Sequence, residues 1–248
     1  MSDKISTVRP FKTPLSEVSA QIDLSTSGLV EFRARSFYEK IKVEYPRTQK
    51  LPVLLVGDPA PNLQYHVPAY RFFSGDAKSA VQLGPRMISV NALSWDTKFE
   101  GYRIMAYSII DKYASSMPDE PVMGYSIGFY NRIPAADIAE VQSFFKLELG
   151  DEKTSFEELS YQRRRVCEAG SLLIQVATAP PDERMSEKHL IVNNIVRRVF
   201  SEDEKRTVKD IQSEWQEWLV KAHAVAKDVF WDSLTPAAQK SWKETVPA

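Results

Sequence analysis

The sequence predicts an α+β protein in which helices pack on one face of an antiparallel-rich sheet. Residues 18–24 and 122–133 alternate apolar and polar side chains, as strands with one buried face do, and residues 102–113 repeat apolar side chains at helical spacing. The order strand, helix, several strands, helix, strand is typical of two helices covering one face of an antiparallel or mixed sheet. The buried face of 122–133 is expected to carry Met123, Tyr125, Ile127 and Phe129.

The elements of the first half follow from local patterns. Residues 1–15 are mostly polar, and we expect them to be flexible. A helix is expected from 30 to 41, because its apolar residues lie three or four positions apart, and Pro46 ends it. Short apolar or alternating runs predict strands, the last two forming a hairpin; these runs are 51–56, 65–73, 80–83 and 86–93. Pro68 lacks an N–H and favours an edge position for the run that contains it.

The second half contains a short helix expected around 138–145, strands at 171–177 and 189–200, and a long helix at 208–231. The long helix closes the core through one apolar face, which consists of Ile211, Trp215, Trp218, Leu219, Ala222, Ala226 and Phe230. We treat 16–248 as a single domain, with any boundary between two lobes near 134–155.

Composition bounds the classes of function. The 248 residues carry 32 Lys and Arg against 33 Asp and Glu, and the formal net charge of -1 argues against a bulk electrostatic attraction to nucleic acid. Cys167 is the single cysteine, which excludes an internal disulfide and a zinc site built on several cysteines. The N-terminal residues contain no apolar signal-peptide core, and no run approaches about 18 apolar residues, so we expect a cytoplasmic protein with no membrane partner.

No catalytic constellation is visible in the sequence. His66, His189 and His223 do not form a metal-ligand spacing, and no nucleophile elbow, phosphate loop or dinucleotide-binding motif occurs. We therefore expect no catalytic residue, no metal ligand and no cofactor. His223 is the best single polar candidate, but a histidine beside the apolar face of a helix is more often a hydrogen-bonded structural residue.

Two arginine clusters are candidate binding sites: Arg163, Arg164 and Arg165, and Arg197 and Arg198. If their segments are neighbouring strands, they form one phosphate-binding patch beside Tyr161, since the planar guanidinium donates paired hydrogen bonds. Arg163, Arg164 and Arg165 would also favour a Cys167 thiolate, although a free cysteine is more often a part-buried structural residue. The alternative is a solvated sheet face, which the near-zero net charge favours. The acids expected to neutralise it are Glu157, Glu158, Glu168, Glu202 and Glu204.

The tryptophans of the C-terminal region have two interpretations, core packing or a partner surface. Trp215 and Trp218 share the core-facing side of the long helix, whereas Trp231 is offset from it. Trp242 lies on a separate short helix that begins after Thr235. We expect Trp231 or Trp242 to be exposed unless a second chain covers it, which indicates a protein partner or self-association.

Four stretches resemble an uncharacterised, sporadically distributed protein family of bacteria and archaea whose members have about this length. They are 81–91, which ends in Asn91, then 99–102, then Tyr130-Asn131-Arg132-Ile133, and finally 218–235. Ala92 follows Asn91 here, where the family pattern tends to place a tryptophan. The resemblance implies a similar fold and a bacterial or archaeal source, and it implies no activity.

The function predicted from the sequence is that of a non-catalytic binding protein acting with a protein partner. One alternative is a nucleic-acid or nucleotide binder that uses the five arginines. The other is an enzyme whose site is assembled from Asn131, Arg132 and His223, although we favour a non-enzyme. The complete set of candidate binding residues is Asn91, Asn131, Arg132, His223, Arg163, Arg164, Arg165, Arg197, Arg198 and Trp242.

Overall fold

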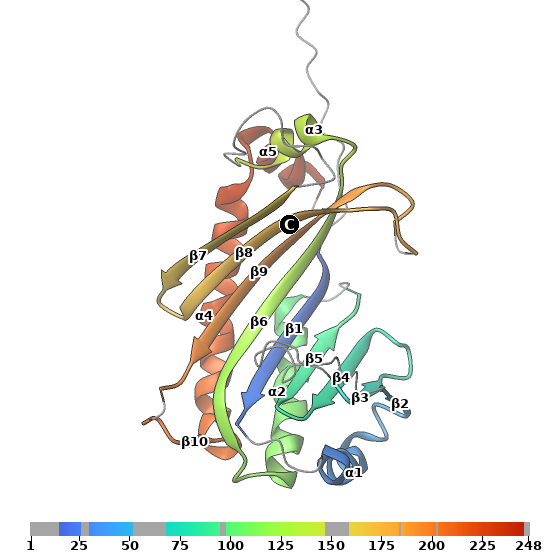
Figure 1. The fold of residues 1–248 in the computed structure, drawn as a ribbon, viewed down its shortest axis with the longest axis vertical. Helices are drawn as coiled ribbons and strands as arrows, with labels where there is room; N and C mark the ends of the chain where they lie inside the picture. The colour runs from blue at the N-terminus through green and yellow to red at the C-terminus, as the bar shows by residue number, and fades with distance from the viewer. Residues whose placement is uncertain are drawn as a thin grey trace, which may run out of the picture.

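The computed structural model describes residues 15–25, 30–51, 68–94, 98–146, 159–183, 185–201 and 203–245. This described part holds one antiparallel sheet of ten strands and five helices, which confirms the predicted α+β class with a long C-terminal helix (Figure 1). The expectations for 1–14 and for a strand at 52–56 fall outside the described residues, as does the side chain of Trp242.

Nine of the described strands follow one another across the sheet in the order β2-β3-β4-β5-β1-β6-β9-β8-β7, and β10 pairs with β6 beside this path. Their bounds are β1 Leu15–Leu24, β2 Arg47–Lys50, β3 Tyr70–Phe73, β4 Ser79–Gly84, β5 Met87–Ala92, β6 Pro121–Pro134, β7 Ser160–Cys167, β8 Gly170–Ala179, β9 His189–Val199 and β10 Arg206–Thr207. The sheet therefore runs without a break through strands from both halves of the chain.

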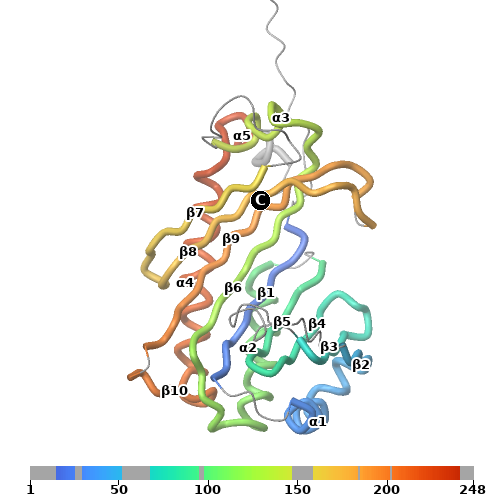
Figure 2. Tube along the Cα trace, in the orientation of Figure 1, coloured from blue at the N-terminus to red at the C-terminus, as the bar shows by residue number. Residues whose placement is uncertain are grey.

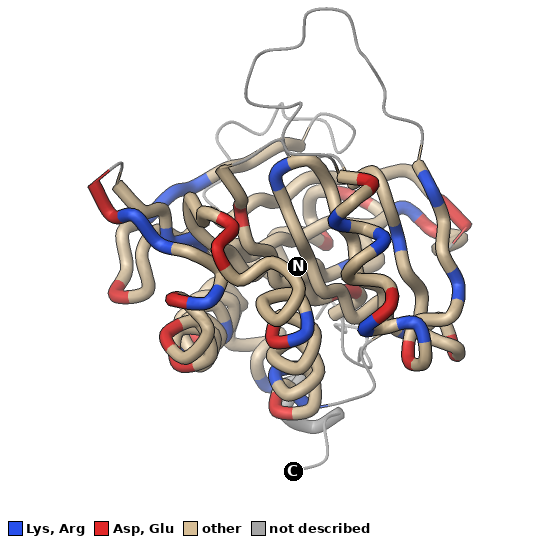
Figure 3. The backbone as a smooth tube through the Cα atoms, turned by 90° about the horizontal axis from the view of Figure 1, so that it is seen from below, with Lys and Arg blue, Asp and Glu red and all other residues tan. Residues whose placement is uncertain are grey.

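The helices form a second layer on one face of this sheet. Their bounds are α1 Val30–Ile41, α2 Phe99–Ser116, α3 Ile138–Phe144, α4 Val208–Ser233 and α5 Pro236–Thr245. α1 packs near β4, α2 packs on β5, and α4 packs on β6 and β9, with α2 in contact with both of the other two helices (Figure 2, Figure 3). α3 and α5 pack against each other at one end of the sheet.

Residue alternation divides each strand between the two faces of the sheet. Phe129 of β6 contacts Phe99 of α2 and His223 of α4, so it lies on the side that we call the helix face. Its partners in register, Val18 of β1 and Asn194 of β9, share that side. The opposite side, which we call the far face, holds the intervening residues of each strand.

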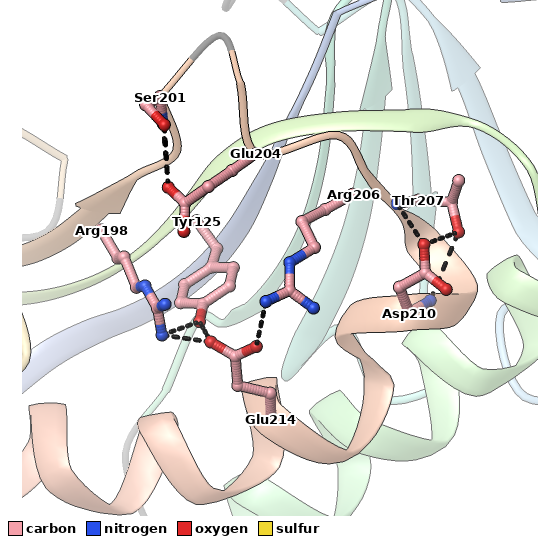
Figure 4. Close-up of polar contacts among 8 residues, drawn as sticks. All are labelled: Tyr125, Arg198, Ser201, Glu204, Arg206, Thr207, Asp210 and Glu214. Carbon is pink, nitrogen blue, oxygen red and sulfur yellow. Dashed lines mark hydrogen bonds and ion pairs between the residues drawn. The ribbon is translucent and has the colours of Figure 1, made fainter.

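The long helix α4 is specified by its cap and by its apolar face. Thr207 Oγ1 accepts a hydrogen bond from the N–H of Asp210 at 3.3 Å, and the Asp210 carboxylate accepts one from the N–H of Thr207 at 2.9 Å. This capping box satisfies N–H groups that have no partner inside the helix (Figure 4). Of the seven residues predicted to face the core, six are buried, and Phe230 is part-buried against the same core.

Three expectations are wrong in detail. The register between β1 and β6 shifts at Asp23 and Leu24, so Val122 is buried and Met123 is 47% exposed, against the expected alternation. β3 lies between β2 and β4, so the strand that follows Pro68 is not an edge strand. The strands at the two ends of the order, β2 and β7, were not expected, because their residues are mostly polar and exposed and show no apolar alternation.

Candidate binding surface on the edge strand

His223 is part of the packing between α2 and α4. Its ring stacks on Phe99 with the ring centres 3.8 Å apart, and it lies 5.6 Å from the ring centre of Phe129. Burial, helped by the nearby Lys227 ammonium, lowers the pKa of His223 to about 4. The imidazole is therefore neutral near pH 7 and acts as a packing residue.

The two candidate asparagines use their side-chain amides inside the sheet. Asn91 donates to the carbonyl oxygen of Ala80 at 3.2 Å and to Ser89 Oγ at 3.1 Å. Asn131 donates to the carbonyl oxygen of Val192 at 3.0 Å. Both residues are buried, so these bonds compensate amide groups that have been removed from water. Both amides thus stabilise the pairing of strands.

Arg132 joins a cluster at the end of β6 that the sequence did not reveal. Its guanidinium binds the Asp182 carboxylate, and its Nη1 lies 3.2 Å from Nε2 of the buried His189. A guanidinium only donates, so Nε2 of His189 accepts and the ring proton sits on Nδ1, 3.3 Å from the carbonyl oxygen of Glu187. Both ring nitrogens of His189 therefore lie against polar atoms of this cluster. No sequence spacing signals the cluster, since Arg132 and His189 meet through the pairing of β6 with β9.

These placements separate the residues of the enzyme alternative. Asn131 and Arg132 are consecutive on β6, and strand alternation directs the first to the helix face and the second to the far face. Phe129, which His223 contacts, lies on the helix face, so the sheet stands between His223 and Arg132. The three side chains do not share one site.

Arg198 is held on the helix face by partners from β6 and α4 (Figure 4). Its guanidinium binds the Glu214 carboxylate and donates to Tyr125 Oη at 3.3 Å. Tyr125 donates in turn to Glu214 Oε1 at 3.0 Å, and Nη2 of Arg206 lies 4.0 Å from the other oxygen of Glu214. Burial raises the pKa of Tyr125, so its hydroxyl keeps its proton at neutral pH. Two arginines thus share one carboxylate, and Arg198 is engaged in the fold.

Arg197 points to the far face, where it is also paired. Its Nη2 donates to Asp23 Oδ2 at 2.7 Å, and Asp23 Oδ1 accepts a bond from Gln21 at 2.6 Å. Asp23 is buried, and these donors compensate its side-chain oxygens for the loss of water. The pair holds β9 to β1 across the intervening strand β6.

Arg163, Arg164 and Arg165 have a different environment, and we call them the arginine edge. They lie on β7, the last strand in the order, and all three are exposed. None of them makes an ion pair or a side-chain hydrogen bond with any residue that the structure describes. Alternation places Arg163 and Arg165 on the helix-face side of β7 and Arg164 on the far face.

The five arginines do not form the single patch that neighbouring strands would give. β8 separates β7 from β9, and Arg197 and Arg198 point to opposite faces and are both paired. Of the acids expected to neutralise the arginines, the described Glu168 and Glu204 make no ion pair with the arginine edge. Three more lie outside the described residues: Glu157, Glu158 and Glu202. Of the five arginines, the three on β7 are the ones without an ion pair or side-chain hydrogen bond among the described residues.

Apolar side chains accompany the arginine edge. Val166 is 93% exposed. On the far face, Leu173 of β8 lies directly opposite Arg164, and Ile195 of β9 lies directly opposite Leu173. Leu173 and Ile195 are half-buried. The helices α1, α2 and α4 pack on the opposite face of the sheet and do not cover these two residues. Cys167 at the end of β7 packs against the core, so its thiol is in a structural position.

Comparison with known proteins gives no family and no named relative. No protein-family model matches the chain, and no curated protein matches it. The resemblance to a family of bacteria and archaea stays a prediction. Within the described ranges, no helix combines the length and the apolar character that crossing a membrane requires. The same ranges contain no group of three or more His, Cys, Asp or Glu residues that could hold a metal ion.

Proposed function

We propose that this chain is a non-catalytic binding protein that acts with a protein partner and contacts it through the arginine edge. Three adjacent arginines without a partner among the described residues are the main support for this function. The other polar candidates are engaged in the fold or packed in it; these are Asn91, Asn131, Arg132, His223, Arg197 and Arg198.

An unpaired arginine is well suited to a partner's carboxylate. Its guanidinium has five N–H donors in a planar fork, and a carboxylate accepts two of them at once. At the arginine edge, no ion pair or side-chain hydrogen bond with a described residue has to be broken before such a bond forms. Val166 and Leu173 beside the arginines add apolar surface, which protein side chains can cover. Arginines beside apolar groups are frequent among the residues that dominate protein–protein binding energy.

A nucleic-acid ligand is less well supported by the same surface. Single-stranded nucleic acids bind where a basic groove is combined with exposed aromatic rings on which bases stack. Tyr161 is the aromatic residue on β7, and it packs against the core. Arg197 and Arg198, which would extend the basic surface, already bind carboxylates. Three arginines along one strand match a short acidic peptide better than they match a duplex or a stacked single strand.

Binding to two polyanions of equal charge tests this function. Fluorescent poly-L-glutamate and a fluorescent oligothymidylate of the same charge are titrated with the chain and with the variant Arg163→Ala/Arg164→Ala/Arg165→Ala. We expect the wild type to bind poly-L-glutamate more tightly than the oligonucleotide, and the triple variant to lose about tenfold in affinity for the polypeptide, since each lost arginine contact is worth about 1 kcal/mol or less at an exposed site.

A matched control removes three exposed positive charges elsewhere, with the substitutions Arg35→Ala, Lys40→Ala and Lys221→Ala on α1 and α4. If the control variant loses as much affinity as the edge variant, net charge and not the arginine edge determines binding. Tighter binding of the oligonucleotide would instead favour the nucleic-acid alternative.

A further inference from the structure

We propose that β7 receives an acidic, extended segment of the partner protein as an additional strand of the sheet. This proposal rests on the proposed function and specifies the partner segment that the arginine edge binds. Peptides that add to a sheet edge gain affinity from main-chain hydrogen bonds and specificity from alternate side chains. β7 supplies both features, an accessible strand edge and a distinctive row of charges.

The backbone of β7 has hydrogen-bonding groups directed away from β8. A two-residue turn, Glu168 and Ala169, connects the two strands, so the flanking residues Cys167 and Gly170 form a hydrogen-bonded pair. In an antiparallel ladder such pairs alternate with pairs whose N–H and C=O groups point outward. Counting back along β7, the outward-pointing groups belong to Val166, Arg164, Gln162 and Ser160. All four residues are exposed.

β7 lacks most of the features by which natural proteins block an exposed strand edge. It has eight residues, contains no proline, and pairs with β8 without a bulge. Within the part of the chain that the structure describes, the one protective feature of this edge is its positive charge. A positively charged edge repels strands that carry positive charge and attracts strands that carry negative charge. Such an edge therefore selects its partner strand and does not exclude every strand.

Charge also decides which strand fits. A second copy of this chain pairing β7 with β7 would bring two sets of three arginines together, and like charges on facing strand positions destabilise pairing. An acidic segment makes the opposite contribution. Residues directly opposite on neighbouring strands have Cβ atoms about 5 Å apart, close enough for a carboxylate to reach a guanidinium. The preferred segment therefore carries three consecutive Asp or Glu residues opposite the arginine edge, next to an apolar residue opposite Val166.

The substitution Val166→Pro separates strand addition from simple charge attraction. Proline removes the outward N–H of Val166 and leaves the three arginines and the bonds to β8 intact, as proline at a solvent-facing edge position does. The probe is a fluorescent eight-residue peptide with three consecutive glutamates flanked by valine and threonine. We expect Val166→Pro to weaken binding of this peptide about tenfold. Val166→Ala loses the apolar side chain but keeps the N–H, and it is expected to weaken binding only about threefold, so the difference between the two variants reports the main-chain hydrogen bond.

Amide hydrogen exchange gives a second measurement that does not depend on a variant. Adding the peptide is expected to slow exchange at Gln162, Arg164 and Val166, and to leave Arg163 and Arg165 nearly unchanged because their N–H groups already bond to β8. The same peptide carrying N-methyl groups on alternate residues keeps its charge but lacks donors, and it is expected to bind at least about tenfold more weakly.

The outcomes distinguish the two levels of the proposal. If Val166→Pro binds the peptide as the wild type does, and the three amides are not slowed, strand addition is wrong while a charge-guided protein contact survives. If the wild type binds no acidic polypeptide at all, the proposed function fails as well. A dimer of the free chain in sedimentation that Val166→Pro dissolves would overturn the acidic partner in favour of self-association through β7.

Discussion

Arginine occupies two opposite environments in this molecule. α1 and β7 lie on opposite sides of the molecule (Figure 1). Arg33 of α1 is only 4% exposed, and its Nη1 donates to Glu120 at 2.7 Å. Its Nη2 donates to the carbonyl oxygens of Gly84 and Pro85 at 3.2 and 2.6 Å. On the other side, the arginine edge is exposed and has no partner among the described residues.

The difference shows where charge serves the fold and where it is available to a ligand. Arg33 connects α1, the turn between β4 and β5, and the residue before β6, so its charge is compensated only when those elements are in place. A buried charge that loses its partner is strongly destabilising, whereas an exposed charge contributes little to stability. The arginine edge therefore adds little to the free energy of folding, and a partner can use its full hydrogen-bonding capacity.

The largest expected effect is at the buried pair. Glu120→Ala leaves the Arg33 guanidinium buried without its carboxylate and removes the acceptor of the Tyr113 hydroxyl. We expect the free energy of unfolding to fall by about 3–5 kcal/mol in urea denaturation. The control is Glu100→Ala, which removes an exposed partner of Arg103 and is expected to cost less than about 1 kcal/mol. Equal losses for the two variants would remove the contrast between the two environments.

The same contrast holds for apolar side chains. Ile109 of α2 is 2% exposed in the core, whereas Val166 on β7 projects into solvent. Ile109→Ala is expected to lower the free energy of unfolding by about 2–5 kcal/mol, because it removes buried methylene groups and leaves a cavity. Val166→Ala is expected to change it by less than about 0.5 kcal/mol. A loss at Ile109 well below this range would mean that the α2 face is more loosely packed than its burial indicates.

A smaller effect is expected from the part-buried His223. Its pKa in the folded state, about 4, is below the ordinary value of 6.5, so the unfolded chain takes up the proton first as pH falls. Stability from this group is complete above about pH 6.5 and is lost as pH falls toward about 4. His223→Phe keeps a ring against Phe99 but cannot be protonated.

The measurement for His223 is the free energy of unfolding of both proteins at pH 7 and at pH 4.5. Relative to the variant, the wild type is expected to lose about 1 kcal/mol over that interval, after allowance for the partial exposure of the ring. Parallel pH profiles for the two proteins would show that the histidine is as solvated in the fold as in the unfolded chain.

The elements that the sequence predicted are those with a buried face. The alternation in β1, β4, β5 and β6 and the apolar stripes of α1, α2 and α4 all result from contact with one core, and their periods can be read directly. β7 escaped prediction because three consecutive arginines obscure its alternation. Its available signal was Gly170 shortly after Cys167, because glycine indicates a tight turn and a strand after such a turn implies a partner strand before it; in the structure Gly170 has a positive φ of 120°.

The partners of the polar residues could not be predicted, because they depend on strand order. Arg197 and Arg198 were grouped with the arginine edge on the assumption that their strands are neighbours. In the structure β8 lies between β7 and β9. Asp23 of β1 lies beside Arg197 of β9 because β1 and β9 both pair with β6. Asp182 and His189 likewise meet Arg132 only because β9 pairs with β6. Sequence patterns specify which residues are buried, but only topology brings distant polar groups together.

The smallest expected effect is on the stability of the arginine edge itself, and it is the most direct test of the comparison between the two environments. The variant Arg163→Ala/Arg164→Ala/Arg165→Ala should keep the free energy of unfolding within about 0.5 kcal/mol of the wild type, since it removes no ion pair or side-chain hydrogen bond with a described residue. At low ionic strength the variant should be slightly more stable, because three neighbouring positive charges repel one another. Urea denaturation of both proteins in 20 mM and 1 M salt, concentrations at which the screening length changes from about 20 Å to about 3 Å, separates these contributions.

The free energies of unfolding of the two proteins should converge at high salt. If the variant instead loses more than about 1 kcal/mol at both salt concentrations, the three arginines are engaged in the fold as Arg33 is, and they are not free to receive a partner.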